Sequence, residues 1–313
     1  MRVVFVGVVN SAKSALDALV SCGADIAGLF TMDVEYMVST SKMEIEYFVD
    51  FRPTAEELGI PLKQIKNIND HVDDIRSLEP DYVYIIGWPQ IVRREVLSIA
   101  PCIGMHPAPL PKRRGGAPLN WQIIDGETES AVSLLRLGEG IDDGDILIQV
   151  PFSIGPTDYV HNVMNRVCEL TGLAVQKTYP LLAAGREVWK TQDHSRATVT
   201  RRRRPADGLV NWHDSSKRIV DLIRAVSHPF PGAFTYSDGQ AIKMWRAYVP
   251  LGYHPPVRAV PGEVLEFVGD AIVVSTRDYC LGLTEIQIGD ALYLSGPELR
   301  QVYDMLAGKT LGQ

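Results

Sequence analysis

His106 is the residue best suited to acid–base chemistry, because imidazole titrates near neutral pH without a perturbed environment. It lies in the segment CIGMHPAPLPKRRGGAPLNW (102–121), between Gly104 and a run of prolines. Prolines fix φ and remove backbone donors, so we predict that this segment is neither a helix interior nor a central strand. Arg113 and Arg114 add positive charge close by. We interpret the segment as a preorganised loop around one base; a histidine that only bonds within its loop is the alternative.

A second group of polar residues lies in the segment GEGIDDGDI (138–146), between two apolar runs. A solvated hairpin loop explains most of its carboxylates. One of them could instead orient a histidine and stabilise its charged form. The candidates are Glu139, Asp142, Asp143 and Asp145.

Composition limits the classes of function that these residues could serve. The chain has 313 residues and a net charge of −7, so we expect two domains and no overall attraction to nucleic acid or anionic lipid. No apolar run approaches the roughly 18 residues that span a bilayer. The scattered cysteines argue against a disulfide framework or a zinc site, and they favour a reducing compartment. We therefore expect a cytoplasmic protein with no metal; the cysteines are Cys22, Cys102, Cys168 and Cys280.

Buried strands alternate with helices in the N-terminal half of the chain. Strands are predicted at 2–9, 25–30 and 82–87, and helices near 69–78 and 90–99. This alternation indicates an α/β domain with a mostly parallel sheet. The later elements predicted here are strands at 131–137 and 146–154 and a helix at 157–183.

The turn after the first strand contains few glycines. Gly7 stands alone there, so the G-x-G-x-x-G pattern of dinucleotide-binding proteins is absent. Asn10 or Ser11 is expected to cap the helix that follows.

A change in composition separates the C-terminal part of the chain. We predict a catalytic domain at 1–189, a linker at 190–207 and a second domain at 208–313. Short strand-like runs at close spacing predict a small β-barrel or sandwich for the second domain. The arginine run Arg201–Arg204 could bind a diphosphate, although a solvated patch is the simpler interpretation.

The motif GMHPAPLPKRRGG (104–116), followed by DDGDI (142–146), resembles the 10-formyltetrahydrofolate-dependent formyltransferase family. The site pattern of that family is N-x-H-x-S-L-L-P-x-x-R-G, followed by D-x-G-x-I. The segment RRRRPADGLVNW (201–212) resembles the second domain of methionyl-tRNA formyltransferases and nucleotide-sugar N-formyltransferases. The chain is most similar to the branch that formylates UDP-4-amino-4-deoxy-arabinose. The resemblance implies a Rossmann-like sheet followed by an OB-like β domain.

The same resemblance assigns roles to individual residues. His106 and Asp142 match the catalytic histidine and aspartate, and Leu110–Pro111 matches a cis peptide. The pterin of the folate is expected against the stretch 84–91 and under the loop 137–142. The expected cofactor-binding residues are Ile86, Gly87, Trp88, Leu137, Gly140, Ile141 and Asp142. The expected substrate-binding residues are Arg114, Gly115, Asn10, Ser11, Arg203 and Arg204.

The sequence departs from the family pattern at Gly104, which stands where the family has a catalytic asparagine. Such an amide donates to the formyl oxygen as charge develops there, a contact worth about 3 kcal/mol in comparable sites. A water beside His106, or protonated His106, could take over this role. Gly104→Asn is then expected to raise turnover if φ at this position is negative. An apolar side chain in that space would instead favour a non-catalytic protein.

The resemblance implies formyl transfer from 10-formyltetrahydrofolate to an amine, with His106 as the base. We favour a nucleotide-linked amino sugar, as in cell-surface polysaccharide synthesis, over methionyl-tRNA. The reason is that the segment 34–52, where tRNA enzymes have a basic insertion, contains Glu35, Glu44, Glu46 and Asp50. A folate-binding protein of weak activity and a formyltetrahydrofolate hydrolase are the alternatives. A homodimer is compatible with all of these interpretations.

Overall fold

The protein is described by a computed structural model that covers residues 1–41, 47–250, 252–256, 258–289 and 292–312. The chain forms two compact units, each built from three separate segments. Unit 1 contains Met1–Pro118, Glu129–Ile154 and Asn162–Arg202. Unit 2 contains Leu119–Thr128, Gly155–His161 and Arg203–Gln313.

The domain boundaries expected from composition differ from these units in two ways. Two short segments from the N-terminal half of the chain, 119–128 and 155–161, belong to unit 2. The expected linker is divided as well, since 190–202 belongs to unit 1 and 203–207 to unit 2. The change in composition marks only the last point at which the chain leaves unit 1 for unit 2. The chain also enters and leaves unit 2 at 119–128 and at 155–161, where composition does not change.

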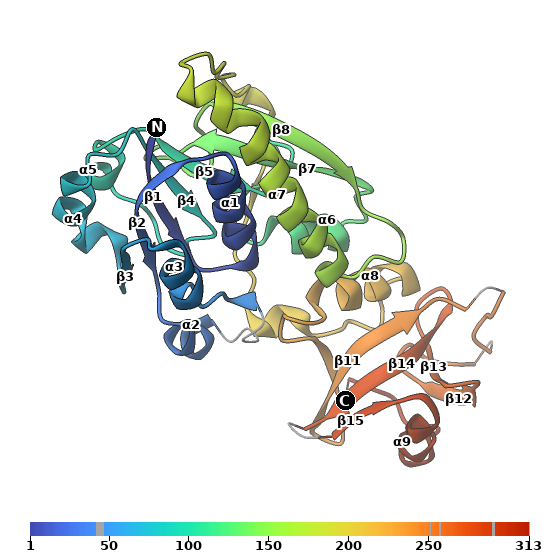
Figure 1. Ribbon diagram of the computed structural model, residues 1–313. Helices are drawn as coiled ribbons and strands as arrows, with labels where there is room; N and C mark the ends of the chain where they lie inside the picture. Colours follow the sequence, from blue (N-terminus) through green and yellow to red (C-terminus); the bar gives the residue numbers. More distant parts are fainter. Residues whose placement is uncertain (42–46, 251, 257, 290–291, 313) are drawn as a thin grey trace. The chain divides into compact units, whose positions relative to one another are not determined.

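Unit 1 contains a seven-stranded sheet with the order β3-β2-β1-β4-β5-β7-β8 (Figure 1). The first five strands in this order are parallel, and the last two pair antiparallel. The predicted α/β class with a mostly parallel sheet is therefore confirmed. The parallel strands are β1 (Arg2–Gly7), β2 (Asp25–Thr31), β3 (Leu62–Gln64), β4 (Tyr82–Ile86) and β5 (Cys102–His106), and the antiparallel ones are β7 (Glu129–Arg136) and β8 (Ile146–Ser153).

Strand β5 corrects the prediction that the segment around His106 is no central strand. Cys102–His106 pairs with β4 on one side and with β7 on the other. The prolines begin at Pro107, after the strand has ended, so they constrain only the loop that follows. His106 is thus the last residue of a central strand.

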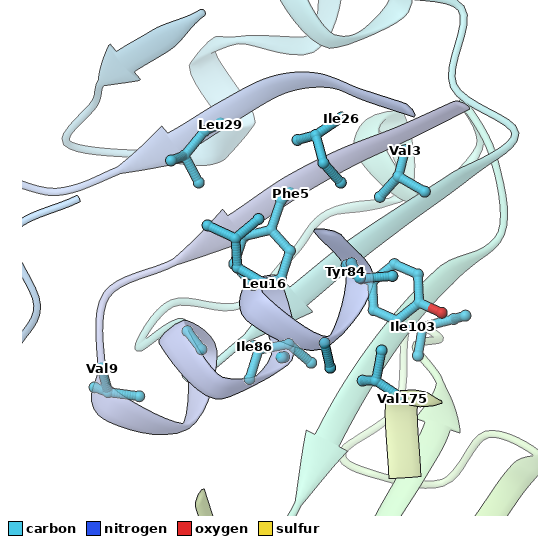
Figure 2. Packing of buried hydrophobic residues seen from close by; sticks show 14 of the residues in the cluster. Val3, Phe5, Val9, Leu16, Ile26, Leu29, Tyr84, Ile86, Ile103 and Val175 are labelled. Atoms are coloured by element: carbon cyan, nitrogen blue, oxygen red, sulfur yellow. The ribbon is translucent and has the colours of Figure 1, made fainter. Parts of the chain in front are cut away.

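Helices cover both faces of this sheet, which explains why its central parallel strands β1, β2 and β4 are almost entirely apolar. One face packs Phe5 and Tyr84 against α1 and α7, as Figure 2 shows for part of this core. The other face packs Val4 and Val83 against α4 and α5. The helices are α1 (Asn10–Ser21), α2 (Val34–Ser41), α3 (Arg52–Leu58), α4 (Val72–Ser77), α5 (Arg94–Leu97) and α7 (Val160–Ala183).

The N-terminus of α1 also corrects an expectation. Neither Asn10 nor Ser11 caps the helix, because both are already helical and Val9 occupies the cap position without a side-chain hydrogen bond.

Unit 2 contains an antiparallel sheet with the order β10-β11-β14-β13-β12, and β15 pairs with β14. This sheet confirms the predicted small β domain. Its strands are β10 (Ala233–Ser237), β11 (Gln240–Tyr248), β12 (Val264–Val268), β13 (Ala271–Ser275), β14 (Cys280–Ile288) and β15 (Leu292–Ser295), and its helices are α6 (Pro118–Ile124), α8 (Ser216–Val226) and α9 (Leu299–Leu306).

A buried ion pair on α8 organises part of unit 2. Arg224 and Asp221 are 6% and 4% exposed, and their charged groups lie 2.6 Å apart. The same guanidinium donates to the carbonyl oxygens of Asp158 and Gly155 at 2.8 and 2.9 Å. Arg224 therefore fixes the segment 155–161 within unit 2, because a buried guanidinium needs these acceptors.

The described part of the chain offers neither a membrane span nor a metal cluster. No helix there has the length and apolarity needed to cross a bilayer. No group of three or more His, Cys, Asp or Glu side chains in that part could hold a metal ion. Its four cysteines are free thiols.

Candidate functional site

Strand β5 presents His106 and Gly104 on the same face, since alternate residues of a strand point the same way. His106 is 5% exposed, and its Nε2 lies 2.7 Å from the carbonyl oxygen of Arg113. A carbonyl oxygen only accepts hydrogen bonds, so Nε2 carries the proton and donates. In the neutral ring the lone pair therefore lies on Nδ1, which is the atom that can take up a proton.

Asp142 faces that atom. Its Oδ2 lies 3.4 Å from Nδ1 of His106 and accepts a hydrogen bond of 2.8 Å from the backbone N–H of Gly115. The Asp142 side chain is 23% exposed, compared with 6% for His106. A proton bound at Nδ1 would lie beside the negatively charged oxygen of this carboxylate. The pair can thus accept a proton from a group that approaches from the Asp142 side.

Cys102 shares the face of β5 with these residues but does not provide a nucleophile. Burial raises the pKa of its thiol to about 12, so the thiolate is scarce at neutral pH.

The proline-rich loop after His106 is held by side chains from neighbouring strands. Prolines supply no N–H donors, but the carbonyl oxygens of Ala108 and Leu110 remain. Ser133 Oγ donates to Ala108 at 2.7 Å, and Gln149 Nε2 donates to Leu110 at 3.0 Å. The peptide between Leu110 and Pro111 is cis, as the resemblance implied.

Gly115 occupies a position that no other residue fits. Its φ is +96°, and an added Cβ would lie 2.5 Å from the carbonyl oxygen of Thr200. The backbones of 113–116 and 198–200 pair here as β6 (Arg114–Gly115) and β9 (Val199–Thr200). They can approach this closely only because residue 115 has no side chain.

Gly115→Ala is therefore expected to lower the free energy of unfolding by about 1–3 kcal/mol, measured by urea denaturation. Gly59→Ala is the matched control, because Gly59 also has positive φ but an added Cβ there would meet no atom within 4 Å. An equal loss in both variants would contradict the role of the Thr200 contact.

Leu137 fills the space beside Gly104. A Cβ on Gly104 would lie 2.4 Å from Cδ2 of Leu137 and 2.9 Å from its Cγ. Leu137 also packs on the small apolar cluster of Leu110, Leu135 and Ile146. An atom added to Cα of Gly104 would therefore meet a methyl group of Leu137, which does not favour the expected water in this space. Space rather than φ limits an asparagine here, since φ of Gly104 lies outside the left-handed range.

The two stretches expected to hold the pterin approach each other. Nε of Arg94, just after the stretch 84–91, lies 3.6 Å from Oε1 of Glu139 in the loop 137–142. In the first stretch Ile86 is buried, and Gly87 has φ of +62° with Val9 pressed against it. In the loop Ile141 is 62% exposed. The roles of Ile86, Gly87, Trp88, Leu137, Gly140 and Ile141 toward a folate stay predictions.

The expected substrate-binding residues are distributed between the two units. Asn10 and Ser11 form the start of α1 in unit 1. Arg114 is 8% exposed and donates to Gln192 Oε1 from both Nε and Nη2, at 3.2 and 2.7 Å. These internal contacts do not favour Arg114 as a diphosphate ligand.

Arg203 and Arg204 belong to unit 2. Arg203 donates to the carbonyl oxygen of Asp207 at 2.6 Å, and its guanidinium lies over the Trp121 ring. Arg204 is exposed, and its backbone N–H donates to the Asp207 carboxylate. Their predicted contacts with a substrate remain predictions.

Sequence reasoning missed the residues that support the site from the expected linker. Gln192 Nε2 donates to the carbonyl oxygens of Asp142 and Gly144. Arg202 donates to the carbonyl oxygen of Pro89 in the first pterin stretch, at 2.5 Å. Both lie in a polar segment without apolar periodicity, so no pattern in the sequence marked them.

Comparisons with known proteins identify the family and the fold of the chain. Sequence profiles described as "Formyl transferase" and "Formyl transferase, C-terminal domain" match residues 30–178 and 203–301. The fold is similar to that of HypX from Aquifex aeolicus in complex with tetrahydrofolic acid, at 19% identity and a TM-score of 0.67. That match covers 99% of this chain and 48% of HypX, so the chain spans about half the length of HypX.

Two shorter proteins share the fold over most of their length. An N-formyltransferase from Helicobacter canadensis, in complex with folinic acid and dTDP-3-aminofucose, is 16% identical with a TM-score of 0.66, over 92% of this chain and 99% of that one. Methionyl-tRNA formyltransferase from Clostridium thermocellum is 20% identical with a TM-score of 0.56, over 80% of this chain and 94% of that one. With both family profiles matched in order along it, the chain belongs to the formyl transferase family.

Proposed function

We propose that the protein transfers a formyl group from 10-formyltetrahydrofolate to the amine of a nucleotide-linked amino sugar. The observation that carries this proposal is the arrangement of His106. Its Nε2 is bonded to a backbone carbonyl, and its Nδ1 faces the carboxylate of Asp142. The buried ring therefore has one basic position, and a carboxylate stands beside it to stabilise the charge that a proton brings.

Formyl transfer needs such a base. The amine nitrogen attacks the formyl carbon, the bond from that carbon to N10 of the folate breaks, and a proton leaves the attacking nitrogen. In our proposal Nδ1 of His106 takes that proton, and Asp142 stabilises the imidazolium. The proton then passes to N10, so that the base is regenerated.

In our proposal the formyl donor binds between two stretches of unit 1. Folate would lie between the stretch 84–91 and the loop 137–142, which carry the exposed apolar side chains of Ile91 and Ile141. Two of the similar structures are complexes with folates, HypX with tetrahydrofolic acid and the H. canadensis enzyme with folinic acid.

Charge favours a small acceptor over tRNA. The net charge is −7, and in the segment 34–52 Glu35 is exposed while Asp50 pairs with Arg52 at 2.7 Å. Glu44 and Glu46 lie outside the described residues. A nucleotide-linked sugar needs only local cations, and the solvent-exposed Arg202 lies beside Gly116 in the same unit.

A panel of acceptors tests the proposal. The full-length protein is incubated with 10-formyltetrahydrofolate and UDP-, dTDP- or GDP-linked amino sugars, or with methionyl-tRNA, and products are detected by their mass. We expect formylation of one class of sugar nucleotide and no salt-dependent retention of tRNA. Formylation of methionyl-tRNA alone would overturn the choice of acceptor but not the reaction.

Leu137 supports a second candidate, a folate-binding protein with weak catalysis. Its side chain takes the place beside Gly104 where an amide donor would have stabilised the developing oxyanion. Tight tetrahydrofolate binding without turnover of any amine would favour this candidate.

Leu137→Ala combined with Gly104→Asn tests whether Leu137 occupies the space that an amide donor would need. Gly104→Asn alone is expected to lower the free energy of unfolding by about 1–3 kcal/mol, because Leu137 blocks the new side chain. Removing Leu137 in the same protein opens the space, so the double variant is expected to exceed the turnover of Leu137→Ala by about tenfold. Turnover is measured by formylated product, and stability by urea denaturation. Additive effects on stability would show that the two side chains do not compete for space.

A further inference from the structure

Gln192 is almost completely buried and bonds in two directions. The residue is 4% exposed. Its Oε1 accepts from Nη2 of Arg114 at 2.7 Å and from Nε at 3.2 Å. Its Nε2 donates to the carbonyl oxygens of Asp142 and Gly144, at 2.9 and 2.7 Å. The amide thus connects a buried guanidinium to the loop that carries Asp142.

These partners leave one orientation for the amide. A guanidinium has donors only, so the amide oxygen must face Arg114. Carbonyl oxygens only accept, so the amide nitrogen must face Asp142 and Gly144. No other neutral side chain of this length offers an acceptor at one end and two donors at the other.

The loop needs such a restraint. Asp142 has a left-handed backbone with φ of +49°, which is uncommon for a residue other than glycine although Asp adopts it more readily than most. At Gly144 an added Cβ would meet the carbonyl oxygen of Arg136, so the chain there passes close to the end of β7. The loop itself is largely exposed at Glu139, Gly140 and Ile141. The two bonds from Gln192 therefore act on the part of the loop that orients the Asp142 carboxylate.

We propose that Gln192 is a positioning residue that holds the 142–144 turn so that Asp142 faces Nδ1 of His106, with Arg114 fixing the orientation of its amide. The catalytic consequence rests on the proposed function, since it acts through Asp142. The structural consequence, order in the loop, does not depend on it.

Gln192→Glu separates the two halves of this arrangement. A carboxylate keeps the contact with Arg114 and the length of the side chain, but it cannot donate to Asp142 and Gly144. We expect kcat to fall about 10- to 100-fold, because a base partner displaced by about an ångström loses this much, with KM for the acceptor little changed. Hydrogen exchange of the backbone amides at 139–145 is expected to become about tenfold faster in the free protein.

Two further variants make the result decisive. Gln192→Met has the same length without a buried charge, and it is expected to loosen the loop in the same way. Gln64→Glu adds the same charge at an exposed site on β3 and is expected to change neither readout. Folding is checked by circular dichroism, and failure of both Gln192 variants to fold would overturn positioning in favour of a purely structural role.

The outcomes distinguish this inference from the proposed function. Unchanged exchange in a folded Gln192→Glu protein would overturn the inference, whatever its activity. Normal kcat in Gln192→Glu with a low kcat in Gln192→Met would show that only the contact with Arg114 matters, and would overturn it too. If the wild-type protein formylates no acceptor, the proposed function fails, while the exchange data still decide the role of Gln192.

Discussion

Replacing His106 with glutamine is expected to lower kcat for formyl transfer by about two to four orders of magnitude. Glutamine can still donate an N–H toward the carbonyl oxygen of Arg113, which now accepts from the ring at 2.7 Å. It has no atom that binds a proton at neutral pH, so the proton-accepting role of Nδ1 is lost. Turnover is followed by the mass of the formylated product, and tetrahydrofolate affinity by calorimetry.

Tetrahydrofolate affinity is expected to stay near that of the wild type in His106→Gln, because the pterin stretches are unchanged. His106→Ala serves as the comparison, since it also removes the bond to Arg113 and is expected to lose stability. Turnover close to wild type in a folded His106→Gln protein would rule out His106 as the base.

Asp142→Asn is expected to lower kcat by about two to three orders of magnitude, since it removes the charge beside Nδ1 but little else. Asparagine tolerates the left-handed backbone found here, with φ of +49°, and its oxygen can still accept from the N–H of Gly115. Asp142→Ala is expected to lose the same activity and, in addition, about 1–2 kcal/mol of the free energy of unfolding. Urea denaturation measures this difference between the two variants.

Because the loop 137–142 is proposed to cover the pterin, Asp142→Ala is also expected to weaken tetrahydrofolate binding. Unchanged folate affinity in that variant would remove the loop from the folate site, but would leave the electrostatic role of Asp142 standing. Equal kcat in Asp142→Asn and wild type would exclude that role.

The α/β class and the pairing of His106 with Asp142 could be predicted from the sequence, each for a physical reason. Valine-rich runs mark strands that are buried on both faces, as Val4 and Phe5 of β1 are. The two site residues lie in motifs of unusual composition, and the structure places their side chains 3.4 Å apart. Local composition and a family pattern were sufficient at these positions.

Other features could not be predicted because they depend on contacts between distant segments. Leu137 meets Gly104 because the chain just after β7 continues beside β5, where the N–H of Leu137 donates to the carbonyl oxygen of Cys102. Nothing near either residue in the sequence indicates this contact. Gln192 belongs to a polar segment whose composition is that of a surface connection, yet it is buried. Strand β5 was not predicted because prolines follow it directly in the sequence. Proline disfavours strands, but Pro107 comes after the strand has ended at His106.

During synthesis the ribosome completes Leu119–Thr128 and Gly155–His161 long before Arg203–Gln313, the segment that holds α8 and the β-sheet of the same unit. The carbonyl oxygens of Gly155 and Asp158 therefore have no guanidinium donor until Arg224 has been synthesised and packs against them. A chain cut before Arg203 leaves these two segments without the unit they belong to. The isolated segment Arg203–Gln313 would bury Arg224 without two of its hydrogen-bond acceptors. The second unit therefore cannot be separated intact from the first by one cut in the chain.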